Sequence, residues 1–505
     1  MFIPVKIVLA GYNVDAEVLS ELKRGSPPRA DVTPETLSAA YARISRDPRP
    51  ADELRAAARA EVERARRSNR NIIFGMGHHS VAEHAVFNFD LIGVSRLAIE
   101  DLERFRLCSF TEKSQRYIRL GEDFVVPAEV REAGLEALFA ATVRRQNALY
   151  HRLYERLRPH VFERNADAAG DPRNHSVLDG WAKEDARYIV SLATQGQLGM
   201  TINARNLEFL IRRFASKPLA ELREIGSRLH ALAGEVAPSI ILFTEGAAFD
   251  AETLQDIGNA SPGSVTAGRS RRAEKGILPR PVRLIDATPD ADDRLLAALA
   301  FATSGDPYDA CLARVRAMTA AAKKRVAKAA FRRMEFYDFP LREFEFPDLT
   351  FELLVSASCY AQLKRHRMAT LTSQPYDPVL GVTVPSSVGE VGAAAEFLDV
   401  VAATDEAHGR LKRAVGPAAD YVLTNAHRRR VLLKISAREL YHVSRLREDA
   451  SAQWDIRAAA AGMSTLARKA MPLTCLMLGG KDAYPGTYRK VFGRPPVMTP
   501  PPMLK

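Results

Sequence analysis

Two stretches of this chain are versions of one another: FDLIGVSRLAIEDLERFR at residues 89–106 and FELLVSASCYAQLKRHR at residues 351–367. Each opens with a short apolar run typical of a buried strand and continues into a sequence with helical spacing. In each, a serine (Ser95 or Ser356) precedes the final Arg-x-Arg by nine residues. A strand and a helix that occur twice in this way predict an internally duplicated fold.

Two further blocks repeat in the same order. The strand-like run VKIVL at residues 5–9 corresponds to VRLI at 282–285, and INARNLEFLIRRF at 202–214 corresponds to ISARELYHVSRLR at 435–447. The separation of equivalent blocks falls along the chain from 277 to 261 to 233 residues. We therefore expect shorter connections in the second half.

The repeats predict the domain organisation and the fold class. We expect a first repeat at residues 1–246, a linker at 247–281 that is rich in Ser, Gly and Arg, and a second repeat at 282–505. Leu, Ala and Arg at helical spacing in 135–157 and 457–471 predict amphipathic helices packed over a sheet. The expected class is α+β, with two helix-rich domains that each contain a small mixed or antiparallel sheet.

Composition excludes several classes of protein. The 505 residues contain no apolar run of membrane-spanning length, and the N-terminus lacks a signal-peptide pattern. The four cysteines are widely scattered, so we expect no disulfide framework and no metal site, and a cytoplasmic location. The net charge of +11 is compatible with binding of nucleic acid or of small phosphorylated ligands. The basic clusters are short and lie in helical segments, which favours solvated helix faces over a nucleic-acid tract.

Two motifs in the first half are specific. Residues 77–84 read GHHSVAEH and residues 104–117 read RFRLCSFTEKSQRY. They resemble the G-H-x-S-x-x-E-H and R-H-R-x-x-S-x-N-E-x-S-x-R-Y signatures of the flavin-dependent thymidylate synthases, except that Phe105 replaces a histidine and Thr111 an asparagine. Two more blocks resemble that family, EDAR at 184–187 and NAR at 203–205.

The first-half loop has a chemistry of its own. Ser114 and Arg116 flank a tight turn, where a hydroxyl, a guanidinium and backbone N–H groups can converge on a phosphate. Glu112 can accept a hydrogen bond from a sugar hydroxyl or orient the turn. The alternative is an ordinary ion pair between Glu112 and Arg116.

The second half has the complementary set of residues. QLKRHR at 362–367 restores the histidine that the first half lacks, whereas Pro375 and Asp377 stand where the phosphate loop would have its serine and arginine. An aspartate there repels a phosphate. The counterpart of Arg187 is Asp420, and no G-H-x-S-x-x-E-H is present.

The block SARELYHVSRLREDASAQWDIR at 436–457 also resembles the family, with Ser436 in place of an asparagine. The resemblance places Arg447 against the uracil ring, where the first half has Phe214. For His366 the alternative is a structural histidine at a helix edge.

The resemblance implies one nearly complete set of functional residues distributed over both repeats. From the first repeat, the dUMP-binding residues are Glu112, Ser114, Gln115, Arg116 and Arg187, and the FAD-binding residues are His78, Ser80, Glu112, Asn203 and Arg205. From the second repeat, dUMP is bound by Gln362 and Arg365, FAD is bound by Arg365, His366, Arg367 and His442, and Arg447 is catalytic.

The implied function is reductive methylation of dUMP to dTMP at composite sites between the repeats. The resemblance implies FAD as cofactor, and methylenetetrahydrofolate and NADPH as co-substrates. Because the family is homotetrameric, the tandem chain is expected to imitate a dimer, and a homodimer of chains a tetramer. The alternative is a degenerate, non-catalytic paralogue that binds nucleotide, flavin or nucleic acid.

Overall fold

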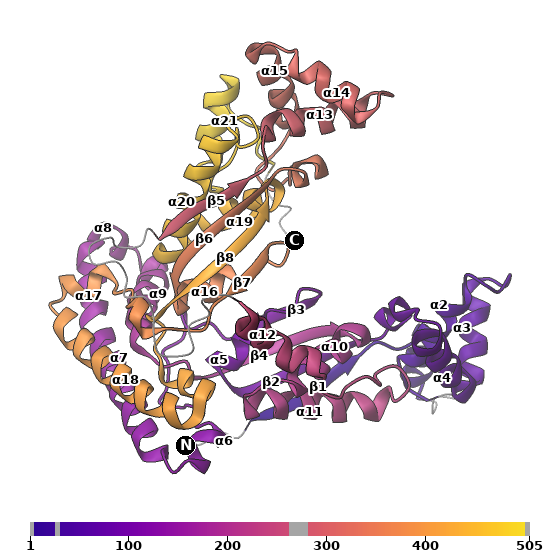
Figure 1. The fold of residues 1–505 in the computed structure, drawn as a ribbon, viewed down its shortest axis with the longest axis horizontal. Coiled ribbons are helices and arrows are strands. Elements are labelled where there is room, and N and C mark those ends of the chain that lie inside the picture. The colour runs from indigo at the N-terminus through magenta and orange to yellow at the C-terminus, as the bar shows by residue number, and fades with distance from the viewer. Residues whose placement is uncertain (1–4, 26–30, 262–280, 500–505) are drawn as a thin grey trace. The chain divides into compact units, whose positions relative to one another are not determined.

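The computed structural model describes residues 5–25, 31–261 and 281–499, which fall into two compact units (Figure 1). Unit 1 comprises the described residues of Met1–Ser270 together with Ser386–Thr424. Unit 2 comprises those of Arg271–Pro385 and Asn425–Lys505. Each unit is described separately.

Unit 1 is built on a four-stranded antiparallel sheet of order β1-β2-β4-β3. Its strands are β1 (Lys6–Tyr12), β2 (Val86–Ser95), β3 (Cys108–Glu112) and β4 (Gln195–Asn203). Phe87, Phe89 and Leu91 are buried and alternate with exposed residues, so β2 packs on the core through one face.

The helices of unit 1 pack around this sheet or extend from it. They are α1 (Ala16–Lys23), α2 (Glu35–Arg43), α3 (Ala51–Ala60), α4 (Val62–Arg70), α5 (Arg96–Leu102), α6 (Ala128–Glu132), α7 (Glu136–Arg164), α8 (Ala166–Ala169), α9 (His175–Ala186), α10 (Ala204–Ala215), α11 (Ala220–Val236), α12 (Ala248–Ala260), α17 (Ser386–Glu390) and α18 (Ala394–Val415). Short helical turns are η1 (Asn71–Gly75), η2 (His79–His84), η3 (Pro172–Asn174), η4 (Arg187–Ile189) and η7 (Gly416–Val422).

Unit 2 has a sheet of the same design, with order β5-β6-β8-β7 and antiparallel pairing throughout. Its strands are β5 (Val282–Ala287), β6 (Asp348–Ser356), β7 (Thr370–Ser373) and β8 (Arg428–Ser436). Its helices are α13 (Ala291–Thr303), α14 (Tyr308–Arg316), α15 (Ala320–Phe331), α16 (Ala357–Leu363), α19 (Ala437–Arg447), α20 (Trp454–Ala470) and α21 (Tyr484–Phe492), with short turns η5 (Arg342–Glu345) and η6 (Pro378–Leu380). The predicted α+β class is confirmed.

The two sheets share their register, with one exception. Ile92 pairs with Gln197 and Leu354 with Arg430, which are equivalent positions, but β2 then shifts by one residue and β6 does not. The additional residue is Gly93, whose φ of 75° is accessible to glycine at little cost. The segment 89–106 is one residue longer than its counterpart 351–367, and the additional residue forms a β-bulge in β2.

The first strands fix the alignment of the repeats more closely than sequence does. Leu9 pairs with Phe89 and Leu284 with Phe351, and both edge strands shift register after that pair. Equivalent residues of the first block are thus 275 positions apart, and the expected 277 was too long by two.

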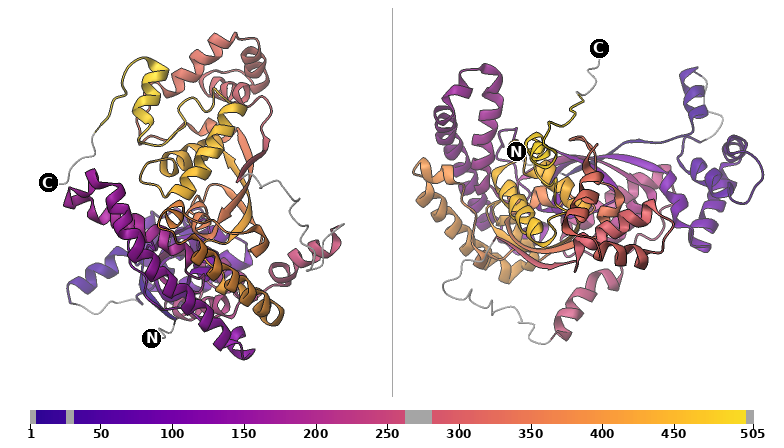
Figure 2. Two further views of the ribbon diagram at one scale, coloured as in Figure 1. Left: turned by 90° about the vertical axis from the view of Figure 1, so that its left-hand side faces the viewer. Right: turned by 90° about the horizontal axis from the view of Figure 1, so that it is seen from above.

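Part of the second repeat belongs to unit 1. Helix α18 lies alongside α7, and Gln146 of α7 donates hydrogen bonds to Thr404 and to the carbonyl of Val422, each at 2.9 Å (Figure 2). Ser191 and Thr424, which are equivalent in the two repeats, form an antiparallel bridge with each other. Contact between equivalent residues is the mark of an isologous interface, which here lies within one polypeptide.

A buried carboxylate supports this interface. Glu221 of α11 accepts from the N–H of Ser95 at 2.7 Å, from its hydroxyl at 2.6 Å and from the hydroxyl of Tyr421 in η7 at 2.6 Å. Ser95 in turn caps α5 by accepting from Ala98 N–H. In unit 2, Ser356 caps α16 and donates to Asp455 at 2.6 Å.

The expected linker is only partly described. Residues 248–260 form α12, none of whose side chains is buried, and residues 262–280 lie outside the described residues. The repeat boundaries at 246 and 282 stay predictions. No described helix is long and apolar enough to cross a membrane.

We predict that Glu221→Ala lowers the free energy of unfolding by about 3 kcal/mol, because three buried donors lose their acceptor. Tyr421→Phe removes one donor to the carboxylate and should cost about 1.5 kcal/mol. Urea unfolding measures both, with Glu224→Ala, on the exposed face of the same helix, as control. Glu221→Ala unfolding like the control would refute a structural role for the carboxylate.

Candidate functional site

Four candidate residues of the second repeat meet at α19. Arg447 Nε donates to His366 Nε2 at 3.0 Å, and Arg447 Nη2 donates to the carbonyl of Gln362 at 3.2 Å. His366 follows α16, whereas Arg447 is the last residue of α19, so the contact joins the Q-x-x-R-H-R segment to the C-terminal block. The imidazole of His442 meets that of His366 edge to face, with ring centres 5.7 Å apart.

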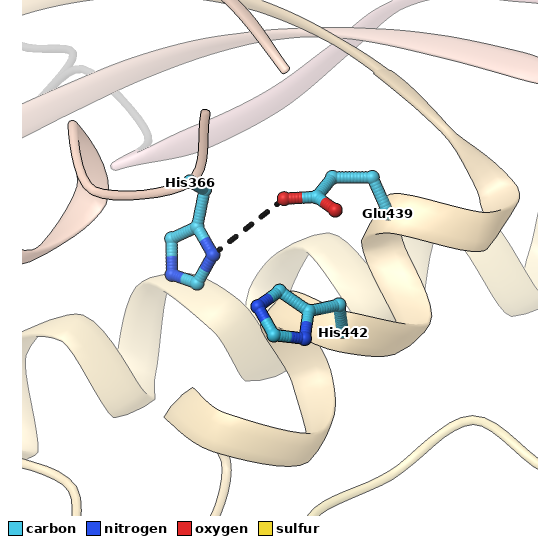
Figure 3. Close-up of side chains that lie close together, drawn as sticks. All are labelled: His366, Glu439 and His442. Carbon is cyan, nitrogen blue, oxygen red and sulfur yellow. Dashed lines mark ion pairs between the residues drawn. The ribbon is translucent and has the colours of Figure 1, made fainter. Parts of the chain in front are cut away.

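Glu439 completes this cluster. It lies one helical turn before His442 on α19, and its Oε1 is 3.8 Å from Nδ1 of His366 (Figure 3). Burial raises the pKa of Glu439 to about 7. Burial, together with Arg447 and His442, holds the pKa of His366 well below its usual range, so the imidazole is neutral.

The cluster has the residue types of a metal site, and the ligand-type atoms of His366, Glu439 and His442 lie within 4.8 Å of one another. Arg447 argues against that use. A guanidinium can only donate, so His366 Nε2 must accept and the ring proton must lie on Nδ1. A protonated nitrogen has no lone pair for an ion.

A cavity of about 490 Å³ opens beside this cluster, lined by Phe339, Glu345, Met368, Ser436, Arg438, Glu439 and His442. Gln362 is buried and its amide lies 3.4 Å from Gln453, the N-cap of α20. Arg365 and Arg367 are exposed on either side of the buried His366.

The first repeat has phenylalanines at the same positions. Phe105, Phe209 and Phe214 stand where the second repeat has His366, His442 and Arg447. Phe105 meets Phe209 edge to face with ring centres 5.9 Å apart, and Phe214 at 6.0 Å. His366 and His442 meet with nearly the same ring geometry as Phe105 and Phe209. The first repeat therefore keeps the packing of the two rings but has apolar side chains there.

The phosphate-loop residues of the first repeat gather around a buried carboxylate. Arg116 Nε donates to Glu184 Oε2 at 2.5 Å, and Ser114 Oγ accepts from the Arg116 N–H at 3.1 Å. Arg187 is buried close by, and its pKa is lowered by burial, with Arg116 among the contributing charges. Arg116 therefore pairs with Glu184 and not with Glu112, the partner considered from sequence.

The second repeat reverses the charge at both arginine positions. Asp377 replaces Arg116 and caps the turn η6. Asp420 replaces Arg187, and its Oδ1 lies 3.0 Å from His408 Nε2 and 3.4 Å from Lys412 Nζ. Asp420 is therefore paired with basic side chains of the protein itself, which is a structural role, and it offers no positive charge to an anionic ligand.

Four further first-repeat candidates lie in or beside η2 and α10. Arg205 forms an ion pair with Glu83 at 2.5 Å, which joins the N-A-R block to the G-H-x-S-x-x-E-H motif. His78 is exposed and lies 3.2 Å from Arg46. Asn203 is the N-cap of α10 and accepts from Asn206 N–H, and Ser80 is exposed in η2.

Sequence reasoning missed two residues that the structure brings into the site. Glu184 was visible as the first letter of EDAR, and its carboxylate is the partner of Arg116. Glu439 stands three residues before His442, a spacing that puts both on one face of a helix. That spacing was the available signal.

Comparison with known proteins agrees with the fold and the motifs. The family described as "Thymidylate synthase complementing protein" matches the chain twice, over residues 30–239 and 283–473. The chain belongs to the flavin-dependent thymidylate synthase family, and the double match confirms the tandem duplication.

Relatives named flavin-dependent thymidylate synthase match parts of the chain. Those of Geobacter sulfurreducens and Clostridium tetani are 34% identical over 172 residues and 26% identical over 208 residues. The matches cover 33% and 41% of this chain, and 65% and 78% of the relatives. The match to the first of these thus spans less than two thirds of that protein.

Two solved structures are similar at low identity. One is a UMP/dUMP methylase PolB from Streptomyces cacaoi bound with 5-Br dUMP, at 18% identity and a TM-score of 0.33, covering 47% of this chain and 92% of that one. The other is the flavin-dependent thymidylate synthase ThyX from Helicobacter pylori complexed with FAD and dUMP, at 15% identity and a TM-score of 0.33, covering 48% and 99%.

We predict that Glu184→Ala destabilises the protein by about 3 kcal/mol, because it removes the carboxylate partner of the half-buried Arg116 and a negative charge close to the buried Arg187. Added inorganic phosphate should recover part of this loss by taking the place of the carboxylate. Urea unfolding with and without phosphate tests both statements. Glu155→Ala, which removes an exposed partner of Arg119, should shift stability by less than about 0.5 kcal/mol and show no phosphate effect.

Proposed function

We propose that the protein catalyses the reductive methylation of dUMP to dTMP at a composite site that draws groups from both repeats. The observation that carries the proposal is the reciprocal loss. The first repeat has both Arg116 and Arg187 but a phenylalanine cluster, and the second repeat has the hydrogen-bonded His366 and Arg447 but aspartates at both arginine positions. Family membership supports the reaction class.

The first repeat would hold the phosphate of dUMP. The groups available for the phosphate are a hydroxyl, an amide and two guanidinium groups, from Ser114, Gln115, Arg116 and Arg187. Arg116 now donates to Glu184, and it would exchange this carboxylate for the phosphate when dUMP binds. Glu112, at the end of β3, would accept a hydrogen bond from the sugar.

The second repeat would hold and polarise the uracil. Arg447 is kept in place by His366 and by the carbonyl of Gln362, so its positive charge is fixed before the substrate binds. A preorganised cation against the pyrimidine favours negative charge on the ring and makes C5 nucleophilic without a covalent bond to the protein. All four cysteines are buried, which suits a reaction without a thiol nucleophile.

The residues of the second repeat also suit a flavin ring. The cavity beside Ser436 and His442 has an aromatic wall at Phe339. The exposed Arg365 and Arg367 could bind the cofactor's phosphates, with His78, Ser80, Asn203 and Arg205 from the first repeat. When bound, FAD would supply the hydride, with NADPH as reductant and methylenetetrahydrofolate as carbon donor.

The quaternary proposal follows from the duplication. The bridge between Ser191 and Thr424 in unit 1 has the pattern of an isologous dimer contact. Two chains would then supply four repeats, as a homodimer that imitates a tetramer.

The first experiment is spectroscopic. We expect the purified chain, or the chain reconstituted with FAD, to show a flavin absorption band that NADPH bleaches under anaerobic conditions, and to form dTMP from dUMP and methylenetetrahydrofolate. A chain that cannot be loaded with FAD would refute the redox function and favour the degenerate nucleotide-binding paralogue.

The second experiment tests the composite site. Arg116→Ala and Arg447→Ala should each abolish turnover, whereas Arg119→Ala and Arg457→Ala, which change an exposed and a half-buried arginine outside the proposed site, should leave it intact. Mixed Arg116→Ala and Arg447→Ala chains should stay inactive if both groups come from one chain. Recovery of activity on mixing would place the shared site between chains, and activity in either single variant would refute a composite site.

A further inference from the structure

The ring of His366 is held in one tautomer by Arg447. The guanidinium donates to Nε2 at 3.0 Å, so a neutral imidazole carries its proton on Nδ1. The side chain is 98% buried, and Nδ1 has no hydrogen-bond partner. A buried N–H without an acceptor is unfavourable, so the structure leaves one donor to be satisfied.

Glu439 places a carboxylate oxygen beside this donor. Its Oε1 lies 3.8 Å from Nδ1, and the dashed line in Figure 3 joins the two side chains, with His366 just after α16 and Glu439 on α19. A shift of less than about 1 Å would bring them to ordinary hydrogen-bond distance. The other carboxylate of the cavity, Glu345, is paired with Arg342 and Arg438 instead.

The first repeat has lost the whole chain of contacts at once. Phe105 and Phe214 replace the histidine and the arginine, and Asn206 replaces Glu439 and turns to Asn203 at 2.8 Å. An aromatic ring offers no donor for a carboxylate. Loss of Glu439 together with its partners is what a unit of three interacting residues would show.

We propose that Glu439 is a positioning residue: its carboxylate accepts the Nδ1 proton of His366 and thereby holds the Nε2 lone pair against Arg447. The two consecutive hydrogen bonds, Glu439 to His366 and His366 to Arg447, then fix the position of the guanidinium. This inference deepens the proposed function, because the role of Arg447 toward uracil rests on that function. The contacts among Glu439, His366 and Arg447 do not depend on the proposed function.

The test is nuclear magnetic resonance on the full chain labelled with ¹⁵N-histidine, without flavin or nucleotide. We expect a slowly exchanging Nδ1–H signal, assigned by its absence in His366→Asn. Glu439→Leu should abolish the signal by opening Nδ1 to exchange, whereas Glu439→Gln, which keeps an acceptor oxygen, should retain it. Glu345→Leu, which changes the other carboxylate of the same cavity, should leave it unchanged.

Three results would overturn the proposal. They are a wild-type His366 protonated on Nε2, a Glu439→Leu spectrum like that of the wild type, and a stoichiometric divalent metal in the purified chain whose removal by chelator changes the signal. In turnover assays kcat/KM for dUMP should fall about tenfold in Glu439→Leu, the size expected for one lost hydrogen bond, and remain near the wild-type value in Glu439→Gln. Failure of the proposed function would remove turnover in every variant without moving the resonance, so the two failures are distinguishable.

Discussion

The structure depends on a serine whose hydroxyl is shared between a helix end and a buried carboxylate. Ser95 caps α5 and is bound by Glu221, and Ser356 caps α16 and is bound by Asp455. Each pair fixes the angle at which a strand passes into the helix that precedes the Arg-x-Arg segment. Burial raises the pKa of Glu221, so the protein tolerates an unfavourable environment for this carboxyl in exchange for three directed hydrogen bonds.

The same carboxylate connects the repeats. Tyr421, which also donates to Glu221, belongs to the second repeat but packs in the core of unit 1. Its neighbours Val422 and Thr424 contact α7 and Ser191, and these are contacts of the kind that separate subunits would make. Because the partner repeat is covalently attached, such an interface forms at high effective concentration. The two repeats have separate sequences, so a residue on one side of the interface can change without the same change on the other side.

Sequence alone predicted much of this architecture. The strands β1, β2, β5 and β6, the long helices α7 and α20, and the pairing of blocks follow from apolar periodicity, which depends on local burial. The bulge at Gly93 was visible as one extra residue. The transfer of α18 into unit 1 was not predictable, because helical amphipathicity shows that a face is buried but not against what. Glu184 beside Arg116 and Glu439 beside His366 were missed for a related reason: each carboxylate is far from its neighbour in sequence, and only the fold brings them together.

The reciprocal losses have a physical logic once the repeats are unequal. A guanidinium such as Arg447 is costly to bury without its acceptor, so replacing His366 alone would leave an unpaired charge. Replacing the whole set by Phe105, Phe209 and Phe214 keeps the packing and removes the charge. Likewise Asp420 acquired His408 and Lys412 as partners where the first repeat has an arginine. Both replacements are fully accommodated by their surroundings. This is the pattern expected when one half of a pair no longer needs a function that the other half retains, and it differs from random decay, which would leave orphaned charges behind.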